Sequence, residues 1–96
     1  MALLDLLGRR WSLRVIWELG QDAATFRDLQ ARCEGMSSSV LSQRLAELRA
    51  AGIARQGEHG YELTGEGREL LGIYPALHAW AGRWAQRGAG AAGDGP

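Results

Sequence analysis

The sequence contains no lysine and only one cysteine, Cys33, among its 96 residues. One cysteine cannot close an internal disulfide bond, which is typical of proteins from a reducing compartment. No apolar run approaches the roughly 18 to 20 residues that a membrane-spanning helix needs, and the leucine-rich residues 1–7 are too short and lack the basic start of a secretory signal. We therefore expect a cytoplasmic protein without membrane association. The Cys33 thiol is expected to pack inside the fold, with a redox sensor as the alternative.

Residue types that carry chemistry are also scarce. His59 lies in a predicted hairpin turn, His78 lies on a predicted helix, and Cys33 has no neighbours of metal-ligand type. A metal site needs several converging ligands, and a catalytic site needs a nucleophile with its base or a pair of carboxylates. The sequence therefore predicts no enzyme, no metal centre and no cofactor. We expect His78 to be a packed helix residue, with a pH-sensitive interface contact as the alternative.

The chain also lacks an excess of either charge. Its 11 acidic residues balance 11 basic residues, and every basic residue is an arginine. DNA-binding domains often carry excess positive charge, so this balance supports a module that contacts other proteins. The placement of the arginines supports DNA instead. Arg44, Arg49 and Arg55 lie within or just after the segment 38–50, and a guanidinium group suits phosphate and guanine contacts. Ion pairs with Glu47 or Glu58 are the alternative role of these arginines.

What the chain does contain is a helix-like segment, 35–48, with an apolar side and a short polar side. Ser37 is a good N-cap, and Gly35 allows the preceding chain to turn sharply. One stripe consists of Leu41, Leu45 and Leu48. The opposite side carries Ser39, Ser42, Gln43 and Ala46. Short hydrogen-bonding side chains let a helix enter a groove and reach base edges, so this pattern predicts a DNA recognition helix over 38–50. An ordinary amphipathic helix with a serine-rich start is the alternative.

Two further helices are predicted before this segment. The first core helix covers residues 13–19 and is followed by a loop over 20–24. The buried face of this helix is predicted to contain Trp11, Val15, Ile16 and Leu19. The second helix covers 26–33 and begins after a capping box formed by Thr25 and Asp28. A short glycine-containing turn leads from it to the third helix, which is the arrangement of a helix-turn-helix motif.

The residues after Gly52 change to a strand-like pattern. Two short strands, 53–56 and 61–63, are predicted on either side of a tight turn over 57–60. A hairpin directly after a recognition helix is a wing, whose tip can lie along the minor groove or a phosphate strand. The wing residues expected to reach DNA are Arg55, Gln56 and His59.

A last helix is predicted over 65–86, with Thr64 as its N-cap and a kink at Pro75. Its apolar stripe is longer than a small core requires, so together with the apolar start of the chain it favours a two-fold dimer interface. The expected interface residues are Leu3, Leu4, Leu7, Tyr74, Leu77, Trp80 and Trp84. An alternative role for the aromatic side chains is a cavity for a small aromatic effector, lined by Trp11, Tyr74, Trp80 and Trp84.

These patterns together predict a mainly helical winged helix-turn-helix with a small β-hairpin, whose terminal helices form a dimer interface. One DNA-binding and dimerisation domain covers residues 1–87. The glycine- and alanine-rich residues 88–96 are predicted to be a disordered tail.

Several short motifs, in order along roughly residues 8–84, resemble the HxlR-type winged-helix transcriptional regulators of bacteria, within the MarR-like superfamily. They are the segments 8–16, 25–29, 35–37, 41–48, 52–53 and 61–67. The resemblance implies a cytoplasmic homodimer that binds a palindromic operator in double-stranded DNA. Helix 38–50 would enter the major groove, hairpin 53–63 would be the wing, and the terminal helices would dimerise.

On this interpretation the candidate DNA contacts extend over the start of the recognition helix and the wing. They are Ser37, Ser38, Ser39, Ser42, Gln43, Arg44, Arg49, Arg55, Gln56 and His59. Two departures from the family are visible. Many members carry a cysteine before the motif that begins at Gly8, in some of them as a redox sensor, whereas residues 1–7 contain none. The wing is also shorter than the family's usual proline-containing hairpin, which favours contact with phosphates alone.

Overall fold

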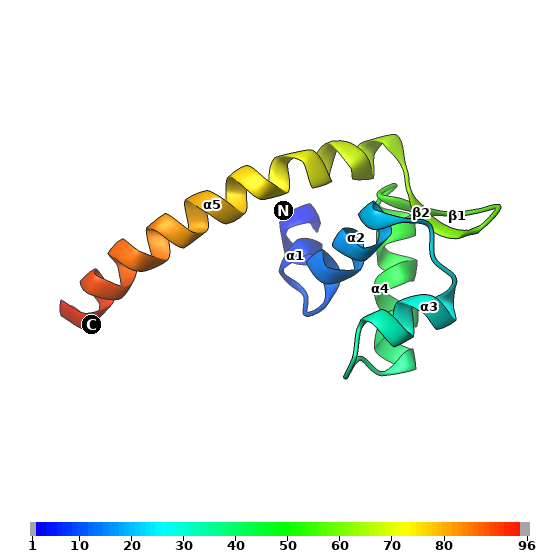
Figure 1. The fold of residues 1–96 in the computed structure, drawn as a ribbon, viewed down its shortest axis with the longest axis horizontal. Helices are drawn as coiled ribbons and strands as arrows, with labels where there is room; N and C mark the ends of the chain where they lie inside the picture. The colour runs from blue at the N-terminus through cyan, green and yellow to red at the C-terminus, as the bar shows by residue number, and fades with distance from the viewer. Residues whose placement is uncertain (1, 95–96) are drawn as a thin grey trace.

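The computed structural model describes residues 2–94, and the side chains of residues 3–87. The described chain forms five helices and two strands (Figure 1). In chain order they are α1 (Ala2–Gly8), α2 (Ser12–Gln21), α3 (Phe26–Arg32), α4 (Ser38–Ala50), β1 (Ala54–Gly57), β2 (Gly60–Leu63) and α5 (Gly65–Asp94). This is the predicted winged helix-turn-helix, since α3 and α4 are joined by a short turn and the hairpin follows α4 directly.

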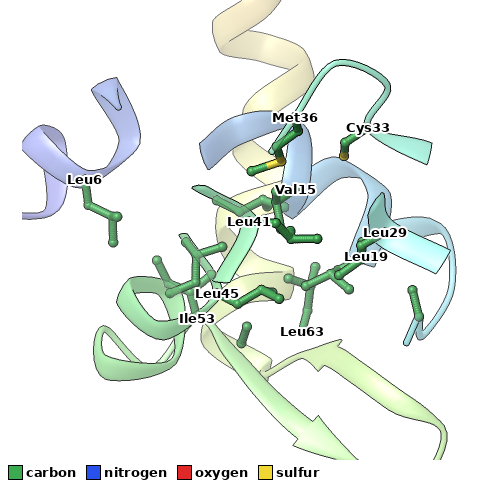
Figure 2. Packing of buried hydrophobic residues seen from close by; sticks show 14 residues of the cluster. Leu6, Val15, Leu19, Leu29, Cys33, Met36, Leu41, Leu45, Ile53 and Leu63 are labelled. Atoms are coloured by element: carbon green, nitrogen blue, oxygen red, sulfur yellow. The ribbon is translucent and has the colours of Figure 1, made fainter. Parts of the chain in front are cut away.

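One apolar core holds these elements together (Figure 2). Each helix of the motif contributes the stripe that its apolar spacing predicts, and the hairpin closes one side. The buried apolar residues are Leu6, Val15, Ile16, Leu19, Ala24, Leu29, Cys33, Met36, Leu41, Leu45, Leu48, Ile53, Ala54 and Leu63. The predicted stripes of α2 and α4 are therefore confirmed, apart from Trp11, which is only partly buried. This core fixes which side of α4 can face a partner.

Local capping starts α3 and α4 where the sequence predicts. The backbone N–H of Asp28 donates to Thr25 Oγ1 at 3.1 Å, and the backbone N–H of Thr25 donates to Asp28 Oδ2 at 3.2 Å. The predicted capping box is confirmed. At the start of α4, the backbone N–H of Val40 donates to Ser37 Oγ at 3.2 Å. These bonds satisfy amide groups that a helix leaves unpaired at its N-terminus.

The α2 helix is longer than its pattern suggests. It continues through Gly20 to Gln21, where the sequence favoured a loop. A side chain at position 20 would collide with that of Leu71 on α5. Glycine here is therefore a point of close helix approach, where α5 crosses α2, and it does not mark the end of the helix.

The hairpin is a short antiparallel ladder that is also tied to the helix-turn-helix. Arg55 pairs with Glu62 and Gln56 with Tyr61, with Glu58 and His59 in the turn. Tyr61 exchanges two backbone hydrogen bonds with Ala24, of 3.0 and 2.7 Å, which adds an isolated bridge beside β2. Gly60 has φ +119°, and a Cβ there would meet the backbone of Ala24. Glycine thus permits both the turn and this close approach.

The α5 helix starts as predicted and ends later. The backbone N–H of Gly67 donates to Thr64 Oγ1 at 3.1 Å, which confirms the predicted N-cap. Pro75 lies inside α5 without ending it, and the ribbon in Figure 1 changes direction near its middle. The helix runs to Asp94, beyond the expected end at residue 86 and over most of the segment 88–96 predicted to be disordered. Alanine is the best helix former, and adding residues to an existing helix is easier than starting one. Residues 95–96 lie outside the described part.

The far half of α5 extends beyond the rest of the molecule (Figure 1). Over residues 2–94, no helix is at once long enough and apolar enough to cross a membrane.

Candidate nucleic-acid interface

The side of α4 that points away from the core carries short side chains, and we refer to it as the outer face. Because Leu41, Leu45 and Leu48 anchor the opposite side, the outer face is held in a fixed orientation. Its exposed residues are Ser38, Ser39, Ser42, Gln43 and Ala46. The outer face thus presents hydroxyl and amide groups without long side chains that would keep a neighbouring surface at a distance. The predicted division of α4 into a buried and an exposed side is confirmed.

The serines at the start of α4 divide between two tasks. Ser37 Oγ accepts the Val40 amide hydrogen bond and lies 3.3 Å from Ser39 Oγ. Its oxygen is therefore used to cap the helix. Ser38 and Ser39 are exposed in the first turn of the helix. At this end of a helix the backbone dipole favours negative groups such as phosphate.

Arg44 is placed differently from the other predicted contacts. Its side chain is only 11% exposed and pairs with the carboxylate of Glu47 on the next turn. Its Nε also donates to the backbone carbonyl of Arg10 at 3.0 Å. The guanidinium thus holds α4 against the α1–α2 turn, and this placement disagrees with the expected role of Arg44 as a phosphate contact that also reaches a base. The alternative pairing with Glu47 that the sequence offered is confirmed.

Arg49 and Arg55 differ in their partners. Arg49 is exposed in the last turn of α4, and no hydrogen bond or ion pair of its side chain occurs within residues 3–87. Arg55 on β1 is 67% exposed, and both its Nε and its Nη2 lie 2.6 Å from Glu62 Oε2 across the hairpin. The alternative partner expected from the sequence was Glu58, but the strand register places Glu62 opposite Arg55. An exposed pair of this kind is weak, yet the nearby carboxylate lowers the attraction of Arg55 for phosphate.

The tip of the hairpin is small. Gln56 and His59 are exposed, and Glu58 shares the turn with His59. The two strands are four residues each, so the hairpin reaches only a short distance beyond α4. This geometry suits contact with one phosphate strand better than insertion along a groove.

A second surface of the molecule is apolar and unusually exposed, and it extends over α1, α2 and α5. It is separate from the outer face of α4. Its large exposed side chains are Leu3, Leu4, Leu13, Trp17, Ile73, Leu77, Trp80 and Trp84. Leu7 and Tyr74, also predicted for an interface, are partly buried against the rest of the protein. We call the exposed residues Leu3, Leu4, Leu13, Trp17, Ile73, Leu77, Trp80 and Trp84 the apolar face. Soluble monomers seldom expose so many large apolar side chains together, so this surface is typical of one that a partner covers.

The described residues therefore form a helix-turn-helix with a short wing, and the apolar face extends over α1, α2 and α5. A family model described as HxlR-like helix-turn-helix matches residues 6–89. The chain belongs to the HxlR-like helix-turn-helix family. The HxlR-like proteins that it resembles are transcriptional regulators, a class without enzymatic activity, and we take this chain to be a transcriptional regulator of that family.

HxlR-like relatives match over most of their length. An uncharacterized HTH-type transcriptional regulator, YvaP from Bacillus subtilis, is 28% identical over 84% of this chain and 82% of its own. The solved structure of quinone-bound YodB from B. subtilis superposes with a TM-score of 0.79 at 28% identity, covering 84% of this chain and 92% of that chain. A possible HxlR family transcriptional factor from Thermoplasma volcanium gives a TM-score of 0.71 at 27% identity, covering 82% and 78%.

The aromatic residues of this HxlR-like chain do not form a common cavity for a small aromatic effector, which was the alternative to a dimer interface. Trp80 and Trp84 stack on each other along α5, with ring centroids 6.4 Å apart. Of the four residues proposed for the cavity, only Tyr74 borders an open hollow of about 520 Å³ between α2 and α5. The hollow is lined by Leu13, Arg14, Trp17, Tyr74, Pro75 and His78. His78 is exposed and stacks on Tyr74 at 5.8 Å, so the expected packing into a core is not seen in the single chain.

Cys33 is buried, as expected for a packed thiol. Burial raises the pKa of the Cys33 thiol because the charged form loses solvation, an effect that the charge of Arg14 opposes. A neutral buried thiol is a poor nucleophile, which favours a structural role.

Sequence reasoning left Ile73 of α5 out of the interface and missed two members of the apolar face on α2, Leu13 and Trp17. They are four residues apart on α2 and therefore lie on one side of it. The signal was present as a second apolar stripe beside Val15 and Leu19. The packing of α2 against α1, α3, α4, α5 and β2 decides which of the two stripes faces the core.

Proposed function

We propose that this transcriptional regulator binds a palindromic DNA operator as a homodimer, with α4 of each protomer in the major groove. The observation that carries the proposal is the outer face of α4. Its exposed side chains are short, polar and held on a rigid helix, which is what reading base edges requires. Membership of the HxlR-like family supports the same function.

Within this proposal the outer face supplies the sequence-reading contacts. Gln43 can pair with adenine through two hydrogen bonds, and the hydroxyls of Ser39 and Ser42 can reach neighbouring bases. Arg49, free of partners in the described residues, is assigned to a backbone phosphate. Ser37 and Ser38 offer amide or hydroxyl hydrogens to a phosphate at the start of the helix.

The wing is assigned to the DNA backbone. Gln56 and His59 lie near its tip, and Arg55 contributes less than an unpaired arginine because Glu62 neutralises it. These contacts would add affinity on any sequence and would not select one.

Dimerisation is assigned to the apolar face, and a second copy of the chain is its proposed occupant. Trp80 and Trp84 are 49% and 56% exposed, and they lie on the half of α5 that extends away from the core of its own chain. Tryptophan side chains are enriched at protein interfaces. A closed two-fold contact covers the same residues on both protomers and places the two α4 helices symmetrically.

A hydrophobic effector in the open hollow is a further candidate, because the hollow joins aromatic side chains with the polar groups of Arg14 and His78. YodB has been solved in a quinone-bound form. Saturable quenching of tryptophan fluorescence by a quinone would support an effector here. Quenching that rises linearly with concentration would show collisions alone, and it would remove the effector from the proposal.

The proposal as a whole is tested by selecting the purified protein against a randomised DNA library, followed by binding measurements at two salt concentrations. The expected result is a palindrome with half-sites about one helical turn apart and an affinity that falls with salt. No enrichment, with weak binding that vanishes at physiological salt, would overturn DNA reading. That result would favour a winged helix that contacts proteins, in line with the zero net charge.

A further inference from the structure

The turn between α1 and α2 forms a basic hollow that takes no part in the DNA contacts proposed for α4 and the wing. Its lining residues are Leu7, Gly8, Arg9, Arg10, Trp11, Leu13 and Arg14. Three of them carry guanidinium groups and none carries a carboxylate. Carboxylates beside the lining, those of Glu47 and Glu18, pair with Arg9 and Arg14, so the excess positive charge of the hollow comes from Arg10. A hollow of this composition suits an anion, and its shallow form suits one displayed on a larger partner.

Within the hollow, Arg10 is the arginine that is free to bind. Arg9 Nη1 lies 3.6 Å from Glu47, and Arg14 Nε donates to Glu18 at 2.8 Å. Arg10 is exposed and forms no ion pair with any side chain of residues 3–87. Its guanidinium lies over the Trp11 ring, 5.7 Å from the centroid. Such stacking orders the side chain while leaving its N–H groups available.

The turn itself is held in an uncommon conformation. Trp11 has φ +77°, the left-handed region that large residues rarely adopt. The Nε of Arg44 donates to the carbonyl of Arg10, which ties the turn to α4. Arg10 is therefore placed relative to the recognition helix by a direct bond, which a flexible loop would not provide.

The hydrogen bond from Arg44 to the Arg10 carbonyl places Arg10 along one edge of the outer face. Glu47, which contacts Arg9, lies four residues after Gln43 and on the same side of α4. Ser42 and Arg49 are seven residues apart and mark the other edge of the outer face. A helix in the major groove lies between two phosphate strands, so each of its edges faces one of them.

We propose that Arg10 binds a DNA backbone phosphate on the strand that borders the Gln43 edge of α4. The inference rests on the proposed DNA binding and adds a contact to it. Leu13, in the same hollow, belongs to the apolar face, and Leu7 lies beside it. The phosphate bound by Arg10 therefore lies on the side of each half-site that faces the partner protomer, towards the centre of the operator.

The test compares Arg10→Ala with Arg87→Ala, which removes the same charge from the distal part of α5. Both are measured by fluorescence anisotropy on the selected operator and on random DNA over a range of salt concentrations. Each lost phosphate contact lowers the slope of log affinity against log salt by about 0.9, so a dimer carrying Arg10→Ala should lose about 2. The loss of affinity should be similar on both DNAs, because phosphates carry no sequence. Arg10→Lys should keep most of the slope, since lysine also binds phosphate.

Ethylation interference on the operator then locates the contact. Arg10→Ala should remove the interference at one phosphate per half-site, between the two half-sites, and leave the base-specific pattern unchanged. A slope and an interference pattern equal to those of Arg87→Ala would overturn the Arg10 contact while DNA binding stands. If the unchanged protein selects no DNA, the proposed function fails and this contact fails with it. Thermal melting of each variant shows whether the fold is intact.

Discussion

The replacement of Trp84 by alanine tests the apolar face most directly. In the single chain Trp84 is 56% exposed, so its loss removes little packing, and alanine suits a helix at least as well. A tryptophan carries up to about 250 Å² of surface, so roughly 140 Å² remains for a partner to cover. At about 25 cal/mol per Å² this corresponds to about 3.5 kcal/mol for each protomer. The monomer–dimer Kd of Trp84→Ala should therefore rise by at least about 100-fold.

Sedimentation equilibrium over a range of concentrations measures this Kd. Arg83→Ala is the matched control, because it shortens the neighbouring exposed side chain on the same helix without removing an aromatic ring. The melting temperature of Trp84→Ala should be lower and should depend on concentration less strongly than that of the unchanged protein, because a chain that associates weakly gains little stability from mass action. Equal dimer Kd values for Trp84→Ala and Arg83→Ala would refute the assignment of α5 to the dimer.

Three further outcomes are expected. Gln43→Ala should cost about 1 to 3 kcal/mol on the selected operator and relax the preference at one base position, and an equal loss on random DNA would show that Gln43 reads no base. Ser12→Ala should raise the free energy of unfolding in urea by about 1 kcal/mol, because Ser12 Oγ is buried without a partner among the described residues; a fall would show that the hydroxyl is satisfied in solution. Hydrogen bonds from the backbone and the side chain of Thr25 hold the pKa of Asp28 below its ordinary 3.8, so its contribution should be full above that pH and lost as pH falls through the lowered pKa. Urea titrations of the unchanged protein and Asp28→Asn should converge in acid, and a constant difference would contradict the linkage.

Features determined by neighbouring residues were predictable from the sequence. The caps at Thr25, Ser37 and Thr64 each need one oxygen and one amide within a single turn. The buried stripe of α4 needs only helical spacing. These terms favour the same structure that the tertiary contacts favour, so the order of helices and the hairpin followed from the sequence.

Features determined by distant residues were not predictable in the same way. The end of α2 depends on Gly20 meeting Leu71, about fifty residues later in the chain. The partner of Arg55 depends on the strand register, which a one-residue shift would change. Arg44 lies on the side of α4 that the α1–α2 turn covers, and its bond to the Arg10 carbonyl joins residues far apart in sequence. In each of these cases the spacing of residues along the sequence allows several contact partners, and the tertiary structure selects one.

The bridge between Ala24 and Tyr61 has a consequence for how this fold can vary. It fixes the hairpin, one residue pair from its turn, to the chain just before α3, so extra residues inserted in the turn formed by Glu58 and His59 leave this attachment in place. Wing length and the orientation of the reading helix are thus separable properties. A protein engineer could graft a longer hairpin at this turn to extend its reach along DNA and leave the choice of bases to α4.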